Sequence, residues 1–168
     1  YVKKLYEVYS GTADLYVYFF EKAHKLLRKE GSFGMICSNK FMRSNYGKSL
    51  RNYLFTNVKI VEIIDFGELP VFQNASTFPA IFLTRKCIVK NQNFLYSPIK
   101  NLQFVSLDEE VKNNGSYLDN QSLANNTWTL VDNKITSIIE KMNKIGLPLG
   151  DYINHEIYFG LKTGLNKA

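Results

Sequence analysis

The sequence has few of the residues that build disulfide frameworks, metal centres or membrane spans. Its only cysteines, Cys37 and Cys87, lie inside apolar runs with no CxxC pattern and no histidine nearby. Unpaired, packed thiols of this kind are typical of a protein from a reducing compartment, so we expect a cytoplasmic location. No apolar run approaches the roughly 18 residues that a membrane span needs, and no secretory signal pattern is present.

Several catalytic and cofactor motifs are also missing. There is no GxGxxG, no HExxH and no EF-hand loop, and Gly47-Lys48-Ser49 does not end a P-loop because Met42 stands where the first glycine is required. His24 and His155 have no partners at metal-ligand spacing. We therefore expect surface or packed histidines and no metal site.

Aromatic and basic residues, by contrast, are plentiful. The 168 residues are 45% hydrophobic and include 12 Phe and 11 Tyr, enough to bury the core of one domain or of a domain with part of another. The net charge of +6 favours polyanionic partners. A solvated surface rich in lysine explains the charge equally well, so both interpretations stay open.

Hydrophobic periodicity alternates between helix and strand in the first half of the chain. The spacing predicts helices from about Thr12 to Glu30 and over Tyr46–Phe55, and the apolar runs Ser32–Ser38 and Val58–Ile64 predict strands that are buried on both faces. This is the α/β alternation of a doubly wound sheet. The next strand, Phe78–Arg85, follows a loop without room for a crossover helix, so we expect it to be antiparallel to a neighbour.

The composition of the chain changes twice along its length. We therefore expect three segments: a first domain at 1–100, a connecting segment at 101–130, and a helix with the start of another domain at 131–168. Asn93–Ser97 is a candidate strand at the sheet edge. The stretch Asn101–Asn126 is rich in Asn, Ser and Asp and predicts a partly irregular surface connection. Asp132 is the predicted N-cap of a helix that carries Ile135, Ile138, Ile139, Met142 and Ile145 at helical spacing. Leu149–Ala168 has the character of the entry to another domain.

The stretch Asp65–Thr84 is the best candidate for a site. It contains a long, semi-polar loop with one bulky aromatic residue, Phe72, near its middle. A hairpin that only reverses the chain direction usually needs two to five residues. We therefore predict that Phe72 stacks on a flat ring, the alternative being an ordinary core aromatic.

Two basic segments are candidate contacts to nucleic acid. The window Lys40–Phe55 has no acidic residue, and phosphate contacts need flexible cations of this kind, although a solvated helix face would look the same. The C-terminal phrase GLKTGLNKA combines flexible backbone with hydrogen-bonding groups. The predicted DNA-contacting residues are Lys40, Arg43, Lys48, Arg51, Lys162, Thr163 and Asn166.

Four segments, in this order, resemble the TaqI-like adenine-N6 DNA methyltransferases, in particular the large fused type IIG restriction–modification enzymes. They read ADLYVYFFEKAHKLLRKEGSFGMICSNKF, YGKSLRNYL, IVEIIDFGELPVFQNASTFPAIF and LPLGDYINHEIYFGLKTGLNKA. The resemblance implies the C-terminal half of a class I (Rossmann-like) methyltransferase domain with an antiparallel last strand, followed by the start of a target-recognition domain. Gly31–Ser38, Val58–Ile64 and Phe78–Arg85 would be its fifth, sixth and seventh strands.

The resemblance also implies roles for two aromatic residues. In this family the target adenine is flipped out of double-stranded DNA and held between two aromatic rings, and Phe72 matches the ring of the late VF loop. Phe19, in the region Asp14–Phe19, would contact the adenine of the methyl donor, S-adenosylmethionine.

The family's glycine-rich donor-binding loop and its [N/D]PP[Y/F] catalytic loop have no counterpart in this sequence. None of the four prolines forms a Pro-Pro pair. We therefore expect a fragment that is inactive alone, in which most of the S-adenosylmethionine site belongs to a missing half. An exposed sheet edge would favour self-association of such a piece.

The function expected from the resemblance is site-specific DNA adenine-N6 methylation within a type II restriction–modification enzyme. Two alternatives remain at this point. One is a class I methyltransferase that acts on RNA or a small molecule, and the other is a non-enzymatic nucleic-acid-binding module.

Overall fold

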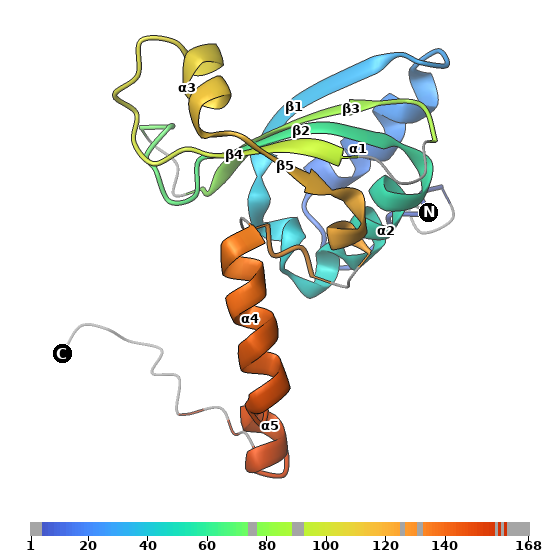
Figure 1. Cartoon of the computed structure of the whole chain (residues 1–168). Coiled ribbons are helices and arrows are strands. Elements are labelled where there is room, and N and C mark those ends of the chain that lie inside the picture. Colours follow the sequence, from blue (N-terminus) through green and yellow to red (C-terminus); the bar gives the residue numbers. More distant parts are fainter. Residues whose placement is uncertain are drawn as a thin grey trace, which may run out of the picture. The chain divides into compact units, whose positions relative to one another are not determined.

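The computed structural model describes residues 5–73, 77–88, 93–124, 127–130, 133–156, 158 and 160. The chain forms two compact units, Tyr1–Leu130 and Val131–Ala168. Within the described residues, the first unit contains a five-stranded sheet and the second contains the helices α4 and α5 (Figure 1).

The expected alternation of helix and strand is present from α1 to β2. The helix predicted over Thr12–Glu30 is shorter, because Leu27 already has extended backbone angles and ends it. Two short 3₁₀ helices, which were not expected, precede α2. The elements are α1 (Leu15–Leu26), β1 (Ser32–Ser38), η2 (Asn39–Met42), η3 (Asn45–Gly47), α2 (Lys48–Asn57) and β2 (Lys59–Asp65).

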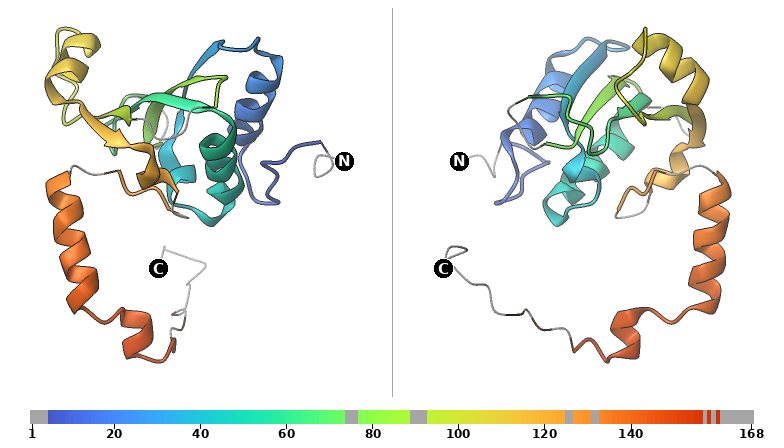
Figure 2. Two further views of the ribbon diagram at one scale, coloured as in Figure 1. Left: turned by 45° about the vertical axis from the view of Figure 1, so that its right-hand side comes forward. Right: turned by 90° about the vertical axis from the view of Figure 1, so that its left-hand side faces the viewer.

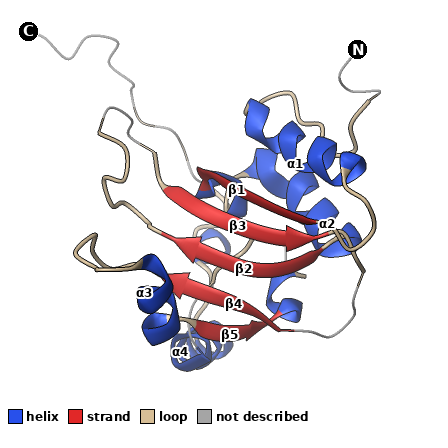
Figure 3. Ribbon diagram, turned by 90° about the horizontal axis from the view of Figure 1, so that it is seen from above, coloured by secondary structure: helices blue, strands red, loops and turns tan. Residues whose placement is uncertain are grey.

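The sheet is mixed, with the strand order β1-β3-β2-β4-β5. β3 (Pro79–Arg85) lies between β1 and β2 and pairs antiparallel with both. β4 (Asn93–Pro98) pairs parallel with β2, and β5 (Ser116–Asp119) pairs antiparallel with β4. β1, β2 and β4 therefore point the same way, and their carboxyl ends lie at one edge of the sheet (Figure 3). The predicted antiparallel strand is confirmed.

One expectation about β1 is wrong. The apolar run Ser32–Ser38 predicted a strand buried on both faces, but its residues alternate between exposed and half-buried. β1 is the outermost strand on its side of the sheet, so neighbouring strands and helices cover it only partly. Ile36, for example, is 43% exposed.

Hydrophobic clusters lie on both faces of the sheet. On one face, α1 and α2 pack on the strands through Phe20, Leu50 and Leu54, all fully buried. On the other face lies α3 (Leu107–Asn114) (Figure 2). Its Val111 belongs to the same hydrophobic cluster as Ile64 and Ile81. The successive residues Ile81 and Phe82 of β3 belong to opposite clusters, because neighbouring side chains of a strand point to opposite faces.

The histidine on α1 is packed, which is one of the two environments expected for it. His24 is 1% exposed, its Nδ1 lies 2.7 Å from the Phe20 carbonyl oxygen, and its Nε2 lies 2.8 Å from the Thr84 hydroxyl. Because a carbonyl only accepts, Nδ1 carries the proton. Burial lowers the pKa of His24 and so favours the neutral ring.

The segment expected to be an irregular connection is more ordered than its composition suggested. Asn101–Asn126 contains α3, β5 and the 3₁₀ helix η4 (Asn120–Leu123). Directly after it, Trp128 is fully buried and contacts the Phe41 ring at a centroid distance of 5.8 Å. Its Nε1 donates to the Leu123 carbonyl, and its backbone N–H donates to the Met42 carbonyl. Trp128 thus fastens the end of this segment to the core.

The second unit contains α4 (Asn133–Ile145) and α5 (Leu149–Tyr152). The predicted helix is confirmed, while its expected cap, Asp132, lies outside the described residues. No described helix is long and apolar enough to cross a membrane.

Trp128→Ala should lower the free energy of unfolding by about 3–5 kcal/mol, because it removes a fully buried indole from the core. Val105→Ala, at a side chain that is 99% exposed, is the control and should change stability by less than about 0.5 kcal/mol. Urea unfolding curves of the two variants measure the difference. Equal stability of the two variants would contradict the packing described for Trp128.

Candidate functional site

The loop that carries Phe72 begins with a tight turn at the carboxyl end of β2. The Asp65 Oδ1 atom accepts a hydrogen bond of 2.9 Å from the Gly67 N–H, which is the geometry of an Asx turn. Gly67 has φ +55°. Glycine adopts this left-handed conformation at little steric cost because it has no Cβ atom. The Phe66 carbonyl then accepts from the Leu69 N–H at 3.0 Å. The loop therefore has a defined local structure where it leaves the sheet.

Phe72 differs in its surroundings from the apolar side chains that precede it in the loop. Leu69 and Val71 pack against the cluster that contains Ile64 and Val111. Phe72 belongs to neither hydrophobic cluster and is 44% exposed. The alternative of an ordinary core aromatic is therefore excluded for this chain, and Phe72 presents a large part of its ring to solvent.

A buried polar network links the carboxyl ends of the parallel strands. Asn39, which directly follows β1, donates from Nδ2 to Asp65 Oδ1 at 2.9 Å. The Tyr96 hydroxyl of β4 lies 3.5 Å from Asp65 Oδ2. All three side chains are less than 10% exposed, with Asp65 at 6%. This network was not predicted from the sequence.

The Arg43 side chain lies close to this network, and two further cations of the same region are exposed. Burial and the Asp65 carboxylate raise the pKa of Tyr96, while the Arg43 guanidinium is near enough to act in the opposite direction. Arg43 and Lys40, both in or directly after η2, are exposed, and so is Lys48 at the start of α2. Three of the predicted DNA-contacting residues are therefore available to an external anion, and Arg43 lies beside the carboxyl edge.

Arg51 is a correction to the prediction. It is 4% exposed, and its guanidinium donates to the backbone carbonyls of Phe41 and Ser44, the latter at 2.8 Å. These bonds hold the turn between β1 and α2, so Arg51 is a structural residue in this chain and is not available to DNA. Residue type and spacing alone cannot distinguish an arginine that faces solvent from one that binds the backbone.

The remaining predicted residues lie elsewhere. Phe19 is on α1, is 55% exposed and belongs to neither hydrophobic cluster. Lys162, Thr163 and Asn166 lie outside the described residues. No group of three or more His, Cys, Asp or Glu side chains that could hold a metal ion is found in the described part of the chain.

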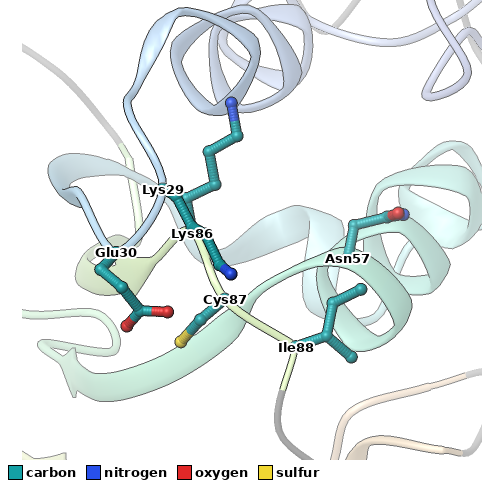
Figure 4. Close-up of a pocket in the computed structure, with 6 residues that line it drawn as sticks. All are labelled: Lys29, Glu30, Asn57, Lys86, Cys87 and Ile88. Carbon is teal, nitrogen blue, oxygen red and sulfur yellow. The ribbon is translucent and has the colours of Figure 1, made fainter.

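A hollow of about 550 Å³ lies at the opposite edge of the sheet (Figure 4). Its walls come from the α1–β1 turn, the end of α2 and the residues after β3. Lys86, one of these wall residues, donates to the Leu27 carbonyl at 2.7 Å at the end of α1. None of the predicted site residues lines this hollow. The candidate site is therefore the Phe72 loop and its surroundings.

Comparison with known proteins indicates what this chain resembles. The model of the Eco57I restriction-modification methylase family matches residues 1–72 and so ends at Phe72. This chain is similar to restriction–modification methyltransferases.

Two relatives are similar over nearly the whole chain. The type II methyltransferase M.BstVI of Geobacillus stearothermophilus is 26% identical over 99% of this chain and 32% of its own length. The type II restriction enzyme and methyltransferase RM.Eco57I of Escherichia coli is 27% identical over 98% of this chain and 16% of its own length. The chain therefore spans a third or less of these relatives.

Solved structures agree on the fold. The type IIG restriction endonuclease BpuSI matches with a TM-score of 0.58 at 16% identity, over 82% of this chain and 18% of that protein. A modification subunit of a type I restriction enzyme from Vibrio vulnificus matches with a TM-score of 0.51 at 11% identity. The match covers 64% of this chain and 28% of that protein. The α/β fold with an antiparallel strand, expected for the C-terminal half of a class I methyltransferase domain, is confirmed.

Arg51→Met should lower the free energy of unfolding by about 1–3 kcal/mol for each carbonyl that loses its donor. Lys48→Met is the matched control, since Lys48 is an exposed cation on the same helix, and it should stay within about 0.5 kcal/mol of the wild type. Chemical denaturation measures both. If the two variants were equally stable, the structural role of Arg51 would be wrong.

Proposed function

We propose that this chain is the base-capturing part of a larger, site-specific DNA adenine-N6 methyltransferase of the TaqI-like kind, within a cytoplasmic type II restriction–modification enzyme. One observation carries the proposal: an exposed aromatic ring, Phe72, stands on an anchored loop at the carboxyl edge of a methyltransferase-like sheet. Ligands of open α/β sheets bind outside the carboxyl ends of the strands. The similarity to type II methyltransferases supports the choice of DNA as the substrate.

In this proposal, Phe72 forms one wall of the pocket for the flipped adenine. Stacking of a base on an aromatic ring contributes about 1–3 kcal/mol. Extrusion of a base from the duplex costs a few kcal/mol, so a single ring offsets a useful part of that cost. The opposite wall and the groups that accept hydrogen bonds from the target amine would lie outside this chain, in the rest of the larger protein.

S-adenosylmethionine would supply the methyl group, and most of its binding site would also lie outside this chain. Within this chain, the exposed Phe19 ring on α1 offers a flat apolar surface for the donor's adenine. We propose phosphate contacts for Lys40, Arg43 and Lys48, and target-recognition contacts for Lys162, Thr163 and Asn166.

The direct test maps methylated bases in the DNA of cells that express the full-length protein containing this chain. The proposal predicts N6-methyladenine at one recurring sequence. Methylation of cytosine only, or no DNA methylation together with a modified RNA or small molecule, would overturn it.

In that full-length protein, Phe72→Ala should weaken capture of the target base by about 5- to 150-fold, the equivalent of the lost stacking energy. Methyl-donor affinity should hardly change. Fluorescence of 2-aminopurine at the target position reports base capture, and calorimetry reports donor binding. Tyr117→Ala, at a 69% exposed tyrosine of β5, is the control and should retain base capture. Collapse of donor affinity with unchanged fluorescence would contradict the role of Phe72.

The double variant Lys40→Gln/Arg43→Gln should reduce the salt dependence of DNA binding. Each lost phosphate contact lowers the slope of log K against log salt by about 0.9, so the expected change is about 2. The control is Lys112→Gln on α3, an exposed lysine whose partner is Asp108, and it should keep the wild-type slope. An unchanged slope in the double variant would make Lys40 and Arg43 plain surface residues.

A further inference from the structure

Among the described residues, Phe72 is partly exposed and lies outside both hydrophobic clusters, so the way its loop is held matters for its position. A ring that stacks on an extruded base needs a fixed position, because misplacement by about 1 Å can cost about 100-fold in rate. The residues that fix the ends of the loop are therefore candidates for a functional role.

Asn39 ties both ends of the Phe72 loop to the end of β1. Its side-chain Nδ2 donates to Asp65 Oδ1 at 2.9 Å, where the loop begins. Its backbone N–H donates to the Phe78 carbonyl at 2.8 Å, where the loop returns to the sheet. One residue thus holds two points of the chain that are separated by the whole loop.

Asp65 is the second part of this arrangement. The same Oδ1 atom that accepts from Asn39 also accepts from the Gly67 N–H at 2.9 Å, which sets the first turn of the loop. Its backbone carbonyl accepts from the Ile99 N–H at 2.8 Å, beyond the end of β4. A buried carboxylate is costly unless hydrogen-bonded donors surround it, so this carboxylate keeps its donors, and with them the turn, in place.

We propose that Asp65 and Asn39 are a positioning pair that holds Phe72 in place for stacking before the target base arrives. Neither side chain touches the base in this proposal, which rests on the proposed function. The pair acts through the loop: Asp65 sets its first turn, and Asn39 sets the separation of its two ends. Leu69 and Val71 then direct Phe72 toward solvent.

The test compares variants of the full-length protein by 2-aminopurine fluorescence, single-turnover methylation and thermal unfolding. Asp65→Ala should lower base capture about 10- to 100-fold while Phe72 remains present. Asp65→Asn keeps an Oδ1 acceptor for both donors and should restore most of the loss. Asp108→Ala, which removes an exposed carboxylate of α3, is the matched control and should behave as the wild type.

A double-variant cycle separates positioning from general destabilisation. If Asp65 acts through Phe72, Asp65→Ala/Phe72→Ala should be no worse in base capture than Phe72→Ala alone. Losses that simply add would overturn the proposal. Asn39→Ala, which leaves the Asp65–Gly67 turn intact, gives the same comparison if Asp65→Ala does not fold.

Hydrogen exchange at the Gly67 amide provides a readout that needs no activity. Asp65→Ala should increase this exchange and leave exchange in β1 and β3 unchanged, and an unchanged Gly67 rate would overturn the positioning role. If wild-type protein neither methylates adenine nor changes 2-aminopurine fluorescence, the proposed function fails instead. The Gly67 measurement still decides whether Asp65 anchors the loop.

Discussion

The insertion of β3 between β1 and β2 constrains most of the first unit. Because β3 runs antiparallel to both neighbours, the chain must turn back at the carboxyl end of β2. The turn occurs at the edge where β1 and β4 also end. A purely parallel arrangement would have required a crossover helix there. The antiparallel strand therefore creates the loop, and its place in the sheet decides that the loop lies where α/β proteins bind ligands.

The chain then stabilises this loop with polar contacts and presents Phe72 from it. Asp65 and Asn39 fix its ends, and Leu69 and Val71 pack beneath it. The cations Lys40 and Arg43 lie in the segment that follows β1. Arg51 holds that segment in place, because its guanidinium donates to two of the segment's backbone carbonyls. The exposed ring and the exposed cations are thus both supported by buried hydrogen bonds within one sheet edge.

The strands and the Phe72 loop could be predicted because their signals are local. Apolar runs marked β1, β2 and β3, and the length of the loop marked it as more than a turn. The Asn39–Asp65 bond could not be predicted, because it joins residues 26 positions apart whose proximity depends on the sheet order. Arg51 was misassigned because its sequence context does not reveal the carbonyls that it binds. α3 and β5 were missed because each has few apolar residues, and their packing comes from Val111 and Leu118 against the sheet.

Photochemical cross-linking can show whether Phe72 faces an extruded base, as we propose. A DNA duplex with 5-iodouracil at the target position is bound to the full-length protein and irradiated, and the attached peptide is identified by mass spectrometry. We expect a cross-link at Phe72 that disappears in Phe72→Ala. A cross-link confined to other residues, at full yield in Phe72→Ala, would contradict it.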